Sequence, residues 1–271
     1  MEVNPVMIGV LVVEASRRGF RSCGWNFDWS IPEYVKLLDA RGLLDRFTGA
    51  GLGNVPRVLQ SVASRMGLRT RRVVGSFAGG VNFMYQGLLR LGRAAPDMAV
   101  ATVGQFSIEV DALWERNVPY LKCAQARRSA YLNWRFPSED GWIKTECRRG
   151  DEVIGYAVVS IRTLEAVGVQ GVVAASVIDI FWDFQHPGAA AALLLNAECI
   201  GRERGAHIVL SSGTDSRARR AFLASGFIRI PGTAWYGYHS SDPAIAFPPE
   251  SRDWYANRGD ADAAGSLGPI P

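Results

Sequence analysis

The sequence predicts an α/β fold of the α+β kind, in which a mixed central sheet is flanked by helices. Between residues 97 and 240, short apolar segments typical of strands alternate with segments of helical spacing. Two long apolar runs, Val153–Arg162 and Val172–Trp182, are typical of strands buried on both faces. Pro187 and Gly188 follow the second run and open an Ala- and Leu-rich segment, which indicates a helix that begins there.

The elements of this region follow the order β-α-α-β-β-β-α-β-α-β-β. The predicted strands are Val100–Phe106, Trp142–Arg148, Val153–Arg162, Val172–Trp182, His207–Leu210, Phe227–Ile230 and Ala234–Tyr238. The predicted helices are Ile108–Glu115, Ala124–Phe136, Pro187–Arg204 and Asp215–Ala224. Gly150–Asp151 is the expected hairpin turn, and Gly205 ends the third helix. The last two strands, Phe227–Ile230 and Ala234–Tyr238, are expected to pair with each other.

Two further segments flank this domain at 97–240: an appended N-terminal segment, 1–96, and a C-terminal tail, 241–271. The N-terminal segment begins with a buried strand, Val6–Val13, and contains a helix at about Glu33–Ala40. The tail is rich in Pro, Gly, Asp and Ala, and we expect its last residues to be loosely held.

The composition is that of a soluble globular protein. Of 271 residues, 48% are hydrophobic and 21% are charged, which argues against disorder. The net charge is +4, and many of the basic residues occur in scattered Arg pairs without a long basic run. Nucleic acid is therefore not the expected partner. Val6–Val13 is too short to span a membrane, and its acidic flanks disfavour a signal peptide. The four cysteines are too widely spaced for a zinc site or a disulfide scaffold, which favours a reducing, cytoplasmic compartment.

The segment that carries chemistry is the loop Gln185–Ala190, between a buried strand and the helix that follows it. The first turn of a helix has backbone N–H groups without partners, and the helix dipole favours negative charge there. Three small residues, Gly188, Ala189 and Ala190, let a phosphate group approach these N–H groups closely. The loop is therefore predicted to hold a phosphate-bearing cofactor.

The same loop carries a motif. Gln185-x-x-Gly188-x-Ala190 fits the signature Q/R-x-x-G-x-G/A, and with it the region 98–239 resembles the GCN5-related N-acetyltransferase (GNAT) superfamily. A second motif of that superfamily, N-x-x-A-x-x-x-Y-x-x-x-G-F, falls in register on the next helix. Ala218 and the pair Gly226–Phe227 match it, whereas Asp215 and Phe222 stand at the places of the Asn and the Tyr.

The resemblance implies acetyl-CoA, or another acyl-CoA, as the cofactor. The strand before the loop would diverge from the next strand and pair with the pantetheine arm through the backbone of Ile180, Phe181 and Trp182. The residues that would receive the pyrophosphate are Gln185, His186, Pro187, Gly188, Ala189 and Ala190. Asp215 stands where a residue often touches the pantetheine, although a simple helix cap is the favoured interpretation.

Direct transfer of an acyl group to an amine needs a base for the ammonium group and an acid for the leaving thiolate. Asp179 is the candidate base, because it is the only charged residue of its apolar strand and a buried carboxylate needs a partner or a raised pKa. An ion pair with an arginine explains it equally well. Many GNAT proteins use a Tyr as the acid, but Phe222 occupies that position here. Tyr236 or Tyr238 is the candidate substitute, although each is more simply a core residue of a strand.

Other side chains are weaker candidates. His186 is predicted to lie at the surface, His207 to be structural, and Glu146 to face the acceptor cleft. Tyr131, Trp134 and Arg135 share one helical face. Similar Tyr-Leu-x-Trp-Arg segments occur near the acceptor side in a bacterial branch of acetyltransferase-like proteins. The face is either a wall for an acceptor carboxylate or sugar or, as we prefer, an aromatic face packed on the sheet.

The primary hypothesis is an acyl-CoA-dependent N-acyltransferase that acts by direct transfer on a small-molecule amine, such as an amino sugar. The alternative is a non-catalytic acetyltransferase-like domain. It is favoured by Phe222 and by residues 1–35, which resemble the tail of a first copy in tandem members of that branch. An aminoacyl-transferase of the peptidoglycan-bridge type is disfavoured, because those enzymes carry a full paired domain. The sequence predicts no metal site and leaves a homodimer open.

Overall fold

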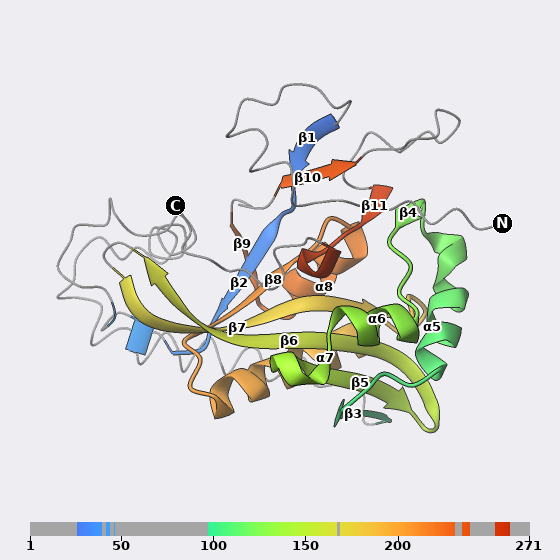
Figure 1. Cartoon of the computed structure of the whole chain (residues 1–271), viewed down its shortest axis with the longest axis horizontal. Helices are drawn as coiled ribbons and strands as arrows, with labels where there is room; N and C mark the ends of the chain where they lie inside the picture. Colours follow the sequence, from blue (N-terminus) through green and yellow to red (C-terminus); the bar gives the residue numbers. More distant parts are fainter. Residues whose placement is uncertain are drawn as a thin grey trace.

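The structure, a computed structural model, describes residues 26–39, 42–43, 46, 97–166, 169–230, 235–238 and 253–260. Its centre is a seven-stranded sheet with the order β3-β5-β6-β7-β8-β2-β9 (Figure 1). In chain order these strands are β2 (Glu33–Leu37), β3 (Met98–Val103), β5 (Ile143–Arg149), β6 (Glu152–Ala166), β7 (Val169–Trp182), β8 (Ile208–Ser212) and β9 (Ile228–Ile230). Neighbouring strands are antiparallel, except that β7 and β8 run parallel.

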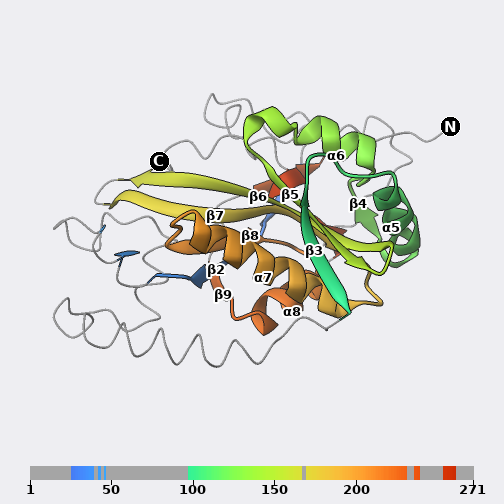
Figure 2. The ribbon, with the colours of Figure 1, turned by 90° about the horizontal axis from the view of Figure 1, so that it is seen from below.

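Helices cover both faces of the sheet (Figure 2). The α-helices are α5 (Glu109–Asn117), α6 (Ser129–Arg135), α7 (Pro187–Glu203) and α8 (Ser216–Ala224). The short 3-10 helices are η2 (Val118–Tyr120), η3 (Ser138–Asp140) and η5 (Arg258–Asp260). α7 and α8 lie on one face and α6 on the other, as Figure 2 shows. Two small ribbons complete the fold: β1 (Asn26–Ser30) pairs with β10 (Trp235–Tyr238), and β4 (Cys123–Ala124) pairs with β11 (Trp254–Tyr255).

The predicted order of elements between residues 97 and 240 is confirmed, with β4 as a short addition between the first two helices. The second helix begins at Ser129 and not at Ala124. The reason is tertiary: Cys123 and Ala124 pair with the distant strand β11, and Arg128 is still extended, with φ −83° and ψ 150°. The helix can begin only after this extended, paired segment ends.

The predicted helix at Glu33–Ala40 is wrong, because this segment forms the strand β2. β2 lies between β8 and β9 and pairs antiparallel with both, so its backbone is hydrogen-bonded on two sides. Tyr34 and Val35 point to opposite faces and are 1% and 2% exposed. Pairing and burial on both faces outweigh the weak helix propensity of the segment. A strand of the N-terminal segment therefore belongs to the central sheet.

The last two predicted strands exist, but they do not pair with each other. β9 pairs with β2, and β10 pairs with β1. Both partners come from the N-terminal segment, which local patterns in the sequence do not reveal. The predicted strand Val6–Val13 lies outside the described residues, as do most of residues 1–96 and of the tail.

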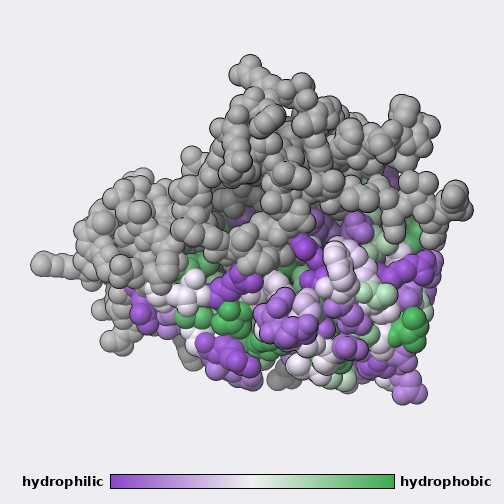
Figure 3. Space-filling model, in the orientation of Figure 1, coloured by the Kyte–Doolittle hydropathy of each residue, from purple (hydrophilic) through white to green (hydrophobic). Residues whose placement is uncertain are grey.

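α7 packs closely on the sheet because its inner face consists of small and aliphatic side chains. Ala189, Ala190, Leu193, Leu194 and Ala197 are all fully buried. These positions repeat with helical spacing, as expected for a helix that buries one stripe. Figure 3 shows the other face of the molecule, which carries α6; in its described part, hydrophobic side chains form small separate groups among hydrophilic ones.

Candidate functional site

The parallel strands β7 and β8 diverge in the middle of the sheet. They are paired only from Ala174 to Val177 on β7 and from Ile208 to Ser211 on β8. β7 continues to Trp182, but there it is paired only with β6. A β-bulge lies at the point of divergence, since the register with β6 shifts between Val177 and Asp179. Bulges bend a strand and increase its twist, which explains why the two strands separate here.

The loop after β7 is organised by the buried carboxylate of Asp183. Its Oδ1 accepts a hydrogen bond from the Gln185 N–H (2.9 Å), and its backbone oxygen accepts one from the His186 N–H (2.8 Å). Arg116 Nε donates to Asp183 Oδ2 (3.2 Å). The Ala189 N–H also donates to the His186 carbonyl oxygen (2.9 Å), so three N–H groups of the predicted phosphate loop are bonded within the protein. Pro187 has no N–H, and the Gly188 N–H is the donor of this turn that remains for a ligand.

Small residues at this turn also serve packing. Ala189 and Ala190 are fully buried against the core. A Cβ added at Gly188 would lie 3.2 Å from Met98 Cε on β3, so a large side chain would meet the sheet as well as any ligand. Pro187 occupies the first position of α7, as predicted, and His186 contacts Arg149 at 3.1 Å.

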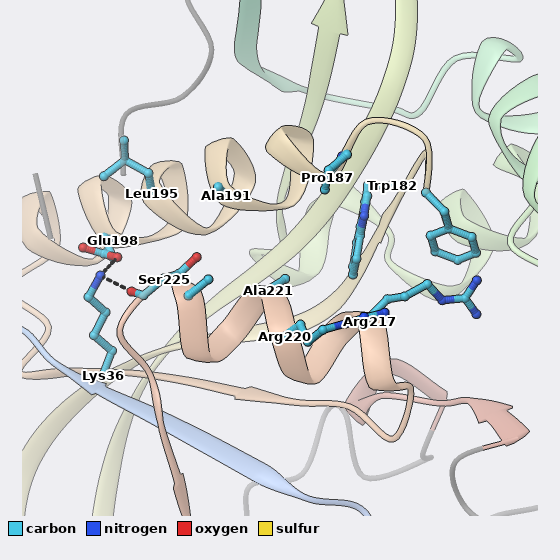
Figure 4. A pocket seen from close by; sticks show the side chains of 12 residues that line it. Lys36, Trp182, Pro187, Ala191, Leu195, Glu198, Arg217, Arg220, Ala221 and Ser225 are labelled. Atoms are coloured by element: carbon cyan, nitrogen blue, oxygen red, sulfur yellow. Dashed lines mark hydrogen bonds and ion pairs between the residues drawn. The ribbon is translucent and has the colours of Figure 1, made fainter. Parts of the chain in front are cut away.

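A groove of about 450 Å³ runs between α7 and α8 (Figure 4). Aromatic and cationic side chains line the end near the loop: Trp182, Phe184, Arg217 and Arg220, together with Pro187. Small or aliphatic side chains line its length: Ala191, Leu195, Ala221 and Ala224. The inner end is formed by Lys36, Glu198 and Ser225. The volume is within the range of sites for small ligands and cofactors.

The charges at the two ends of the groove differ in how they are compensated. Lys36 forms a buried ion pair with Glu198 and donates to the Ser225 carbonyl oxygen (2.7 Å). Arg217 is paired with Asp215 (2.7 Å), and its guanidinium lies 3.8 Å from the ring centre of Phe184. Arg220 has no hydrogen-bonded or ionic partner among the described residues. The end of the groove near the loop therefore carries an excess positive charge.

The prediction that Asp215 is a helix cap is confirmed. Its side chain accepts a hydrogen bond from the Arg217 N–H (2.7 Å) at the start of α8. The same carboxylate holds the Arg217 guanidinium at the mouth of the groove. Asp215 thus contributes to the site by positioning an arginine.

Asp179 lies on the opposite face of the sheet in a buried ionic cluster. Arg127, which is fully buried, contacts Asp179 (3.3 Å) and Asp260 (2.6 Å). Asn257 Nδ2 also donates to Asp179 Oδ1 (2.7 Å). Burial raises the pKa of Asp260 to about 6, although the Arg127 charge acts in the opposite direction. The interpretation of Asp179 as an arginine-paired carboxylate is confirmed, whereas its role as a base stays a prediction.

The C-terminal segment Trp254–Asp260 fills the space where β7 and β8 diverge. Tyr255 Oη donates a hydrogen bond to the Ile180 carbonyl oxygen (2.7 Å). On the other side, the Thr214 N–H donates to the Ala256 carbonyl oxygen (3.0 Å). η5 contacts β7, and Figure 1 shows β11 and η5 in front of the sheet. The backbone position predicted to receive pantetheine is therefore bonded to the protein's own tyrosine.

Phe222 stands where many GNAT proteins have the acid, and Tyr236 and Tyr238 are the candidate substitutes. Phe222 is fully buried and packs on Tyr34, with ring centres 4.8 Å apart. Tyr236 lies on β10, where its backbone is opposite Trp29 of β1 and outside the seven-stranded sheet. The side chains of Tyr236 and Tyr238 lie outside the described residues, so their role as acid stays a prediction.

The weaker candidates have structural partners. His207 Nδ1 accepts a hydrogen bond from the Val173 N–H (3.0 Å), which confirms its structural role. Glu146 is 2% exposed and pairs with Arg148 (2.9 Å). It also accepts a hydrogen bond from the Ser107 N–H (3.1 Å). Both side chains are occupied in holding strands and loops together.

The preferred packing of the aromatic face of α6 is confirmed for Tyr131, which is half-buried against the core, and is wrong for Trp134. Trp134 is 73% exposed, and its ring lies 5.9 Å from that of the half-buried Tyr131. Leu132 and Phe136 are the fully buried residues of this segment. The helix therefore packs through Leu132 and Tyr131, and Phe136 adds to this contact directly after the helix ends. The interpretation of Tyr131 and Trp134 as an acceptor wall stays a prediction.

Several residues of the site are absent from the predicted set. Arg127, Tyr255 and Asp260 were not singled out because their partners lie far away in sequence. Among the described residues, no group of three or more His, Cys, Asp or Glu side chains is arranged to hold a metal ion. None of the helices in the described part is both long enough and apolar enough to cross a membrane.

The element order, the parallel pair β7–β8 within the otherwise antiparallel seven-stranded sheet, its divergence at a bulge and the helix that follows together define a GNAT-like fold. No protein-family model and no curated protein matches the sequence.

Solved structures resemble the chain in part. An aminoglycoside acetyltransferase from an uncultured soil metagenomic sample is 11% identical, with a TM-score of 0.32 over 42% of this chain and 76% of its own. An acetyltransferase from Trypanosoma brucei is 17% identical, with a TM-score of 0.31 over 42% of this chain and 80% of its own. A GCN5-related N-acetyltransferase from Anabaena variabilis is 10% identical, with a TM-score of 0.38 over 82% of this chain and 41% of its own.

Proposed function

We propose that this protein binds an acyl-CoA in the α7–α8 groove and transfers the acyl group to the amine of a small molecule. The observation that carries the proposal is the groove itself, which begins beside the loop after β7 and presents the cationic side chains of Arg217 and Arg220 there. The fold is GNAT-like, and the groove lies next to the helix start that carries the predicted signature.

The chemistry of the groove suits a phosphate-bearing ligand. A guanidinium group matches the geometry of phosphate oxygens and stays charged at all relevant pH values. Arg220 has no partner among the described side chains, and the start of α7 adds a favourable dipole and the Gly188 N–H as a donor. The rings of Trp182 and Phe184 provide flat apolar surface beside these charges. The groove can therefore accommodate the phosphates and the organic part of a cofactor together.

A non-catalytic binding domain is the second candidate, and two observations favour it. The Tyr255 hydroxyl donates a hydrogen bond to the Ile180 carbonyl oxygen. Phe222 is fully buried and has no proton to donate. Under this alternative the groove binds its ligand without turnover.

Calorimetric titration with CoA and acetyl-CoA tests the binding step. We expect saturable binding by the wild type and at least about tenfold weaker binding by Arg220→Glu, because a carboxylate would repel the phosphates. Arg219→Glu is the matched control, since Arg219 is exposed on the same helix but does not line the groove. Equal loss in both variants, or no binding by the wild type, would refute the groove as the site.

Turnover decides between the two candidates. Release of the CoA thiol from acetyl-CoA is followed with a panel of small amines and amino sugars. Amine-dependent release supports an acyltransferase. Saturable binding without release over the whole panel supports the non-catalytic domain.

A further inference from the structure

We propose that the segment Trp254–Asp260 occupies the place of the donor's pantetheine arm, so that the protein in this conformation binds the nucleotide half of CoA and not its arm. This inference rests on the proposed groove for CoA and deepens the second, non-catalytic candidate, because the acyl group is carried by the arm that the segment keeps out. The ligand of the protein in this conformation is then a phosphorylated adenosine nucleotide, and the pantetheine arm adds no contacts between β7 and β8.

The first step concerns the hydrogen-bonding edge of β7. Beyond Val177 this edge is no longer paired with β8, so its carbonyl groups are free to accept from a ligand. The Ile180 carbonyl oxygen accepts instead from Tyr255 Oη at 2.7 Å, and this hydroxyl is buried. A pantetheine amide would have to displace the phenol to reach the same oxygen.

The second step concerns space. Trp254, Tyr255, Ala256 and Asn257 are between 2% and 3% exposed, so the segment fills the divergence. Thr214, which follows β8, binds both the N–H and the carbonyl group of Ala256. The segment is thus bonded to β7 on one side and to the residue that follows β8 on the other, which closes the passage between the two strands.

The third step links the segment to the groove. Trp182 and Phe184 line the groove, and both rings also contact the Tyr255 ring, at centre distances of 6.3 and 6.0 Å. Tyr255 therefore supports the groove wall from behind. A ligand in the groove meets an aromatic wall where an arm would have to pass.

The fourth step concerns how the segment is held. Arg127 bridges Asp179 on β7 and Asp260 on η5. Gly259 lies against Asp179 so closely that an added Cβ would be 2.9 Å from the Asp179 Cβ. Arg258 pairs with Glu33 of β2. The anchors reach strands on both sides of the divergence, so the segment is built into the fold.

The test compares two ligands on the whole protein. Calorimetry measures the affinity of CoA and of phosphoadenosine diphosphate, its nucleotide half without the arm. We expect the two dissociation constants to agree within about threefold for the wild type, because the arm gains no contacts in the divergence. CoA that binds the wild type more than about tenfold tighter than the nucleotide would overturn the inference.

A variant then opens the passage. Tyr255→Ala removes the ring and the hydroxyl, and we expect the affinity for CoA to rise at least about fivefold relative to the nucleotide. Tyr255→Phe is the matched control, since it keeps the ring behind the groove wall and removes only the bond to Ile180. An unchanged CoA-to-nucleotide ratio in folded Tyr255→Ala would contradict the closed passage.

Hydrogen exchange gives a readout that does not depend on a variant. Saturating CoA should leave the exchange of amides 254–260 in the wild type unchanged, because the arm does not enter. Faster exchange on addition of CoA, and not of the nucleotide, would show that the arm displaces the segment and would overturn the inference. If neither ligand binds, the groove proposal fails and the inference falls with it, which is a different outcome from unequal binding.

Discussion

At the scale of single residues, Arg127 has a structural role that local sequence patterns conceal. Its guanidinium is fully buried and joins Asp179 to Asp260, a residue more than a hundred positions away. Charges removed from water are costly unless they are paired and hydrogen-bonded, and this cluster meets both conditions. The carboxylate of Asp179, the candidate base, is therefore ion-paired with Arg127.

The raised pKa of Asp260 makes a prediction about stability. Because the pKa of about 6 in the folded protein exceeds the ordinary value of 3.8, the folded state binds this proton more tightly than the unfolded state. Its contribution to stability is full below a pH of about 4 and is lost as the pH rises through about 6. Urea unfolding of the wild type and of Asp260→Asn should show the wild type losing stability relative to the variant over this range. A constant difference would contradict the shift.

At the scale of elements, β2 shows that neighbours decide the type of a segment. Glu33–Leu37 has helical features in sequence, but an open position between β8 and β9 offers hydrogen bonds on both edges. The divergence of β7 and β8 is also an element-scale feature. It follows from one bulged position near Ile178, where β7 bends away from its parallel neighbour.

The central position of β2 predicts a large effect of proline. Val35 lies opposite Leu210 on one side and Ile228 on the other. Val35→Pro removes a backbone donor in the middle of the sheet, and we expect a loss of about 3 kcal/mol or more in the free energy of unfolding in urea. Val35→Ala, which keeps the donor and loses only part of the side chain, is the control and should lose less. Equal losses would argue against a central strand.

At the scale of the whole molecule, parts from both ends of the chain complete the domain. β2 enters the central sheet, and Trp254–Asp260 enters the divergence between β7 and β8. The groove, the closed passage and the ionic cluster thus lie in one folded body, with the groove on the α7–α8 face and the cluster on the other.

This arrangement predicts that the C-terminal segment is as well protected as the sheet. The backbone N–H groups of Ala256, Asn257 and Gly259 are all hydrogen-bonded within the protein. Their deuterium exchange should therefore be slow and comparable to that of β7. Exchange at the rate of an unstructured chain would show that the segment is only loosely attached. Amides of solvent-exposed η3 provide a fast-exchanging reference in the same sample.

The sequence by itself determined the order of elements, the loop after β7 and the helix cap at Asp215. These features are local: periodicity, a Pro-Gly start and a capping side chain act over a few residues. Only the tertiary structure decided the strand character of β2, the partner of Asp179 and the occupant of the divergence. Each depends on contacts between residues far apart in the chain, such as Tyr255 with Ile180. Strand pairing and burial between distant parts of the chain outweigh local propensity, and no short sequence pattern encodes them.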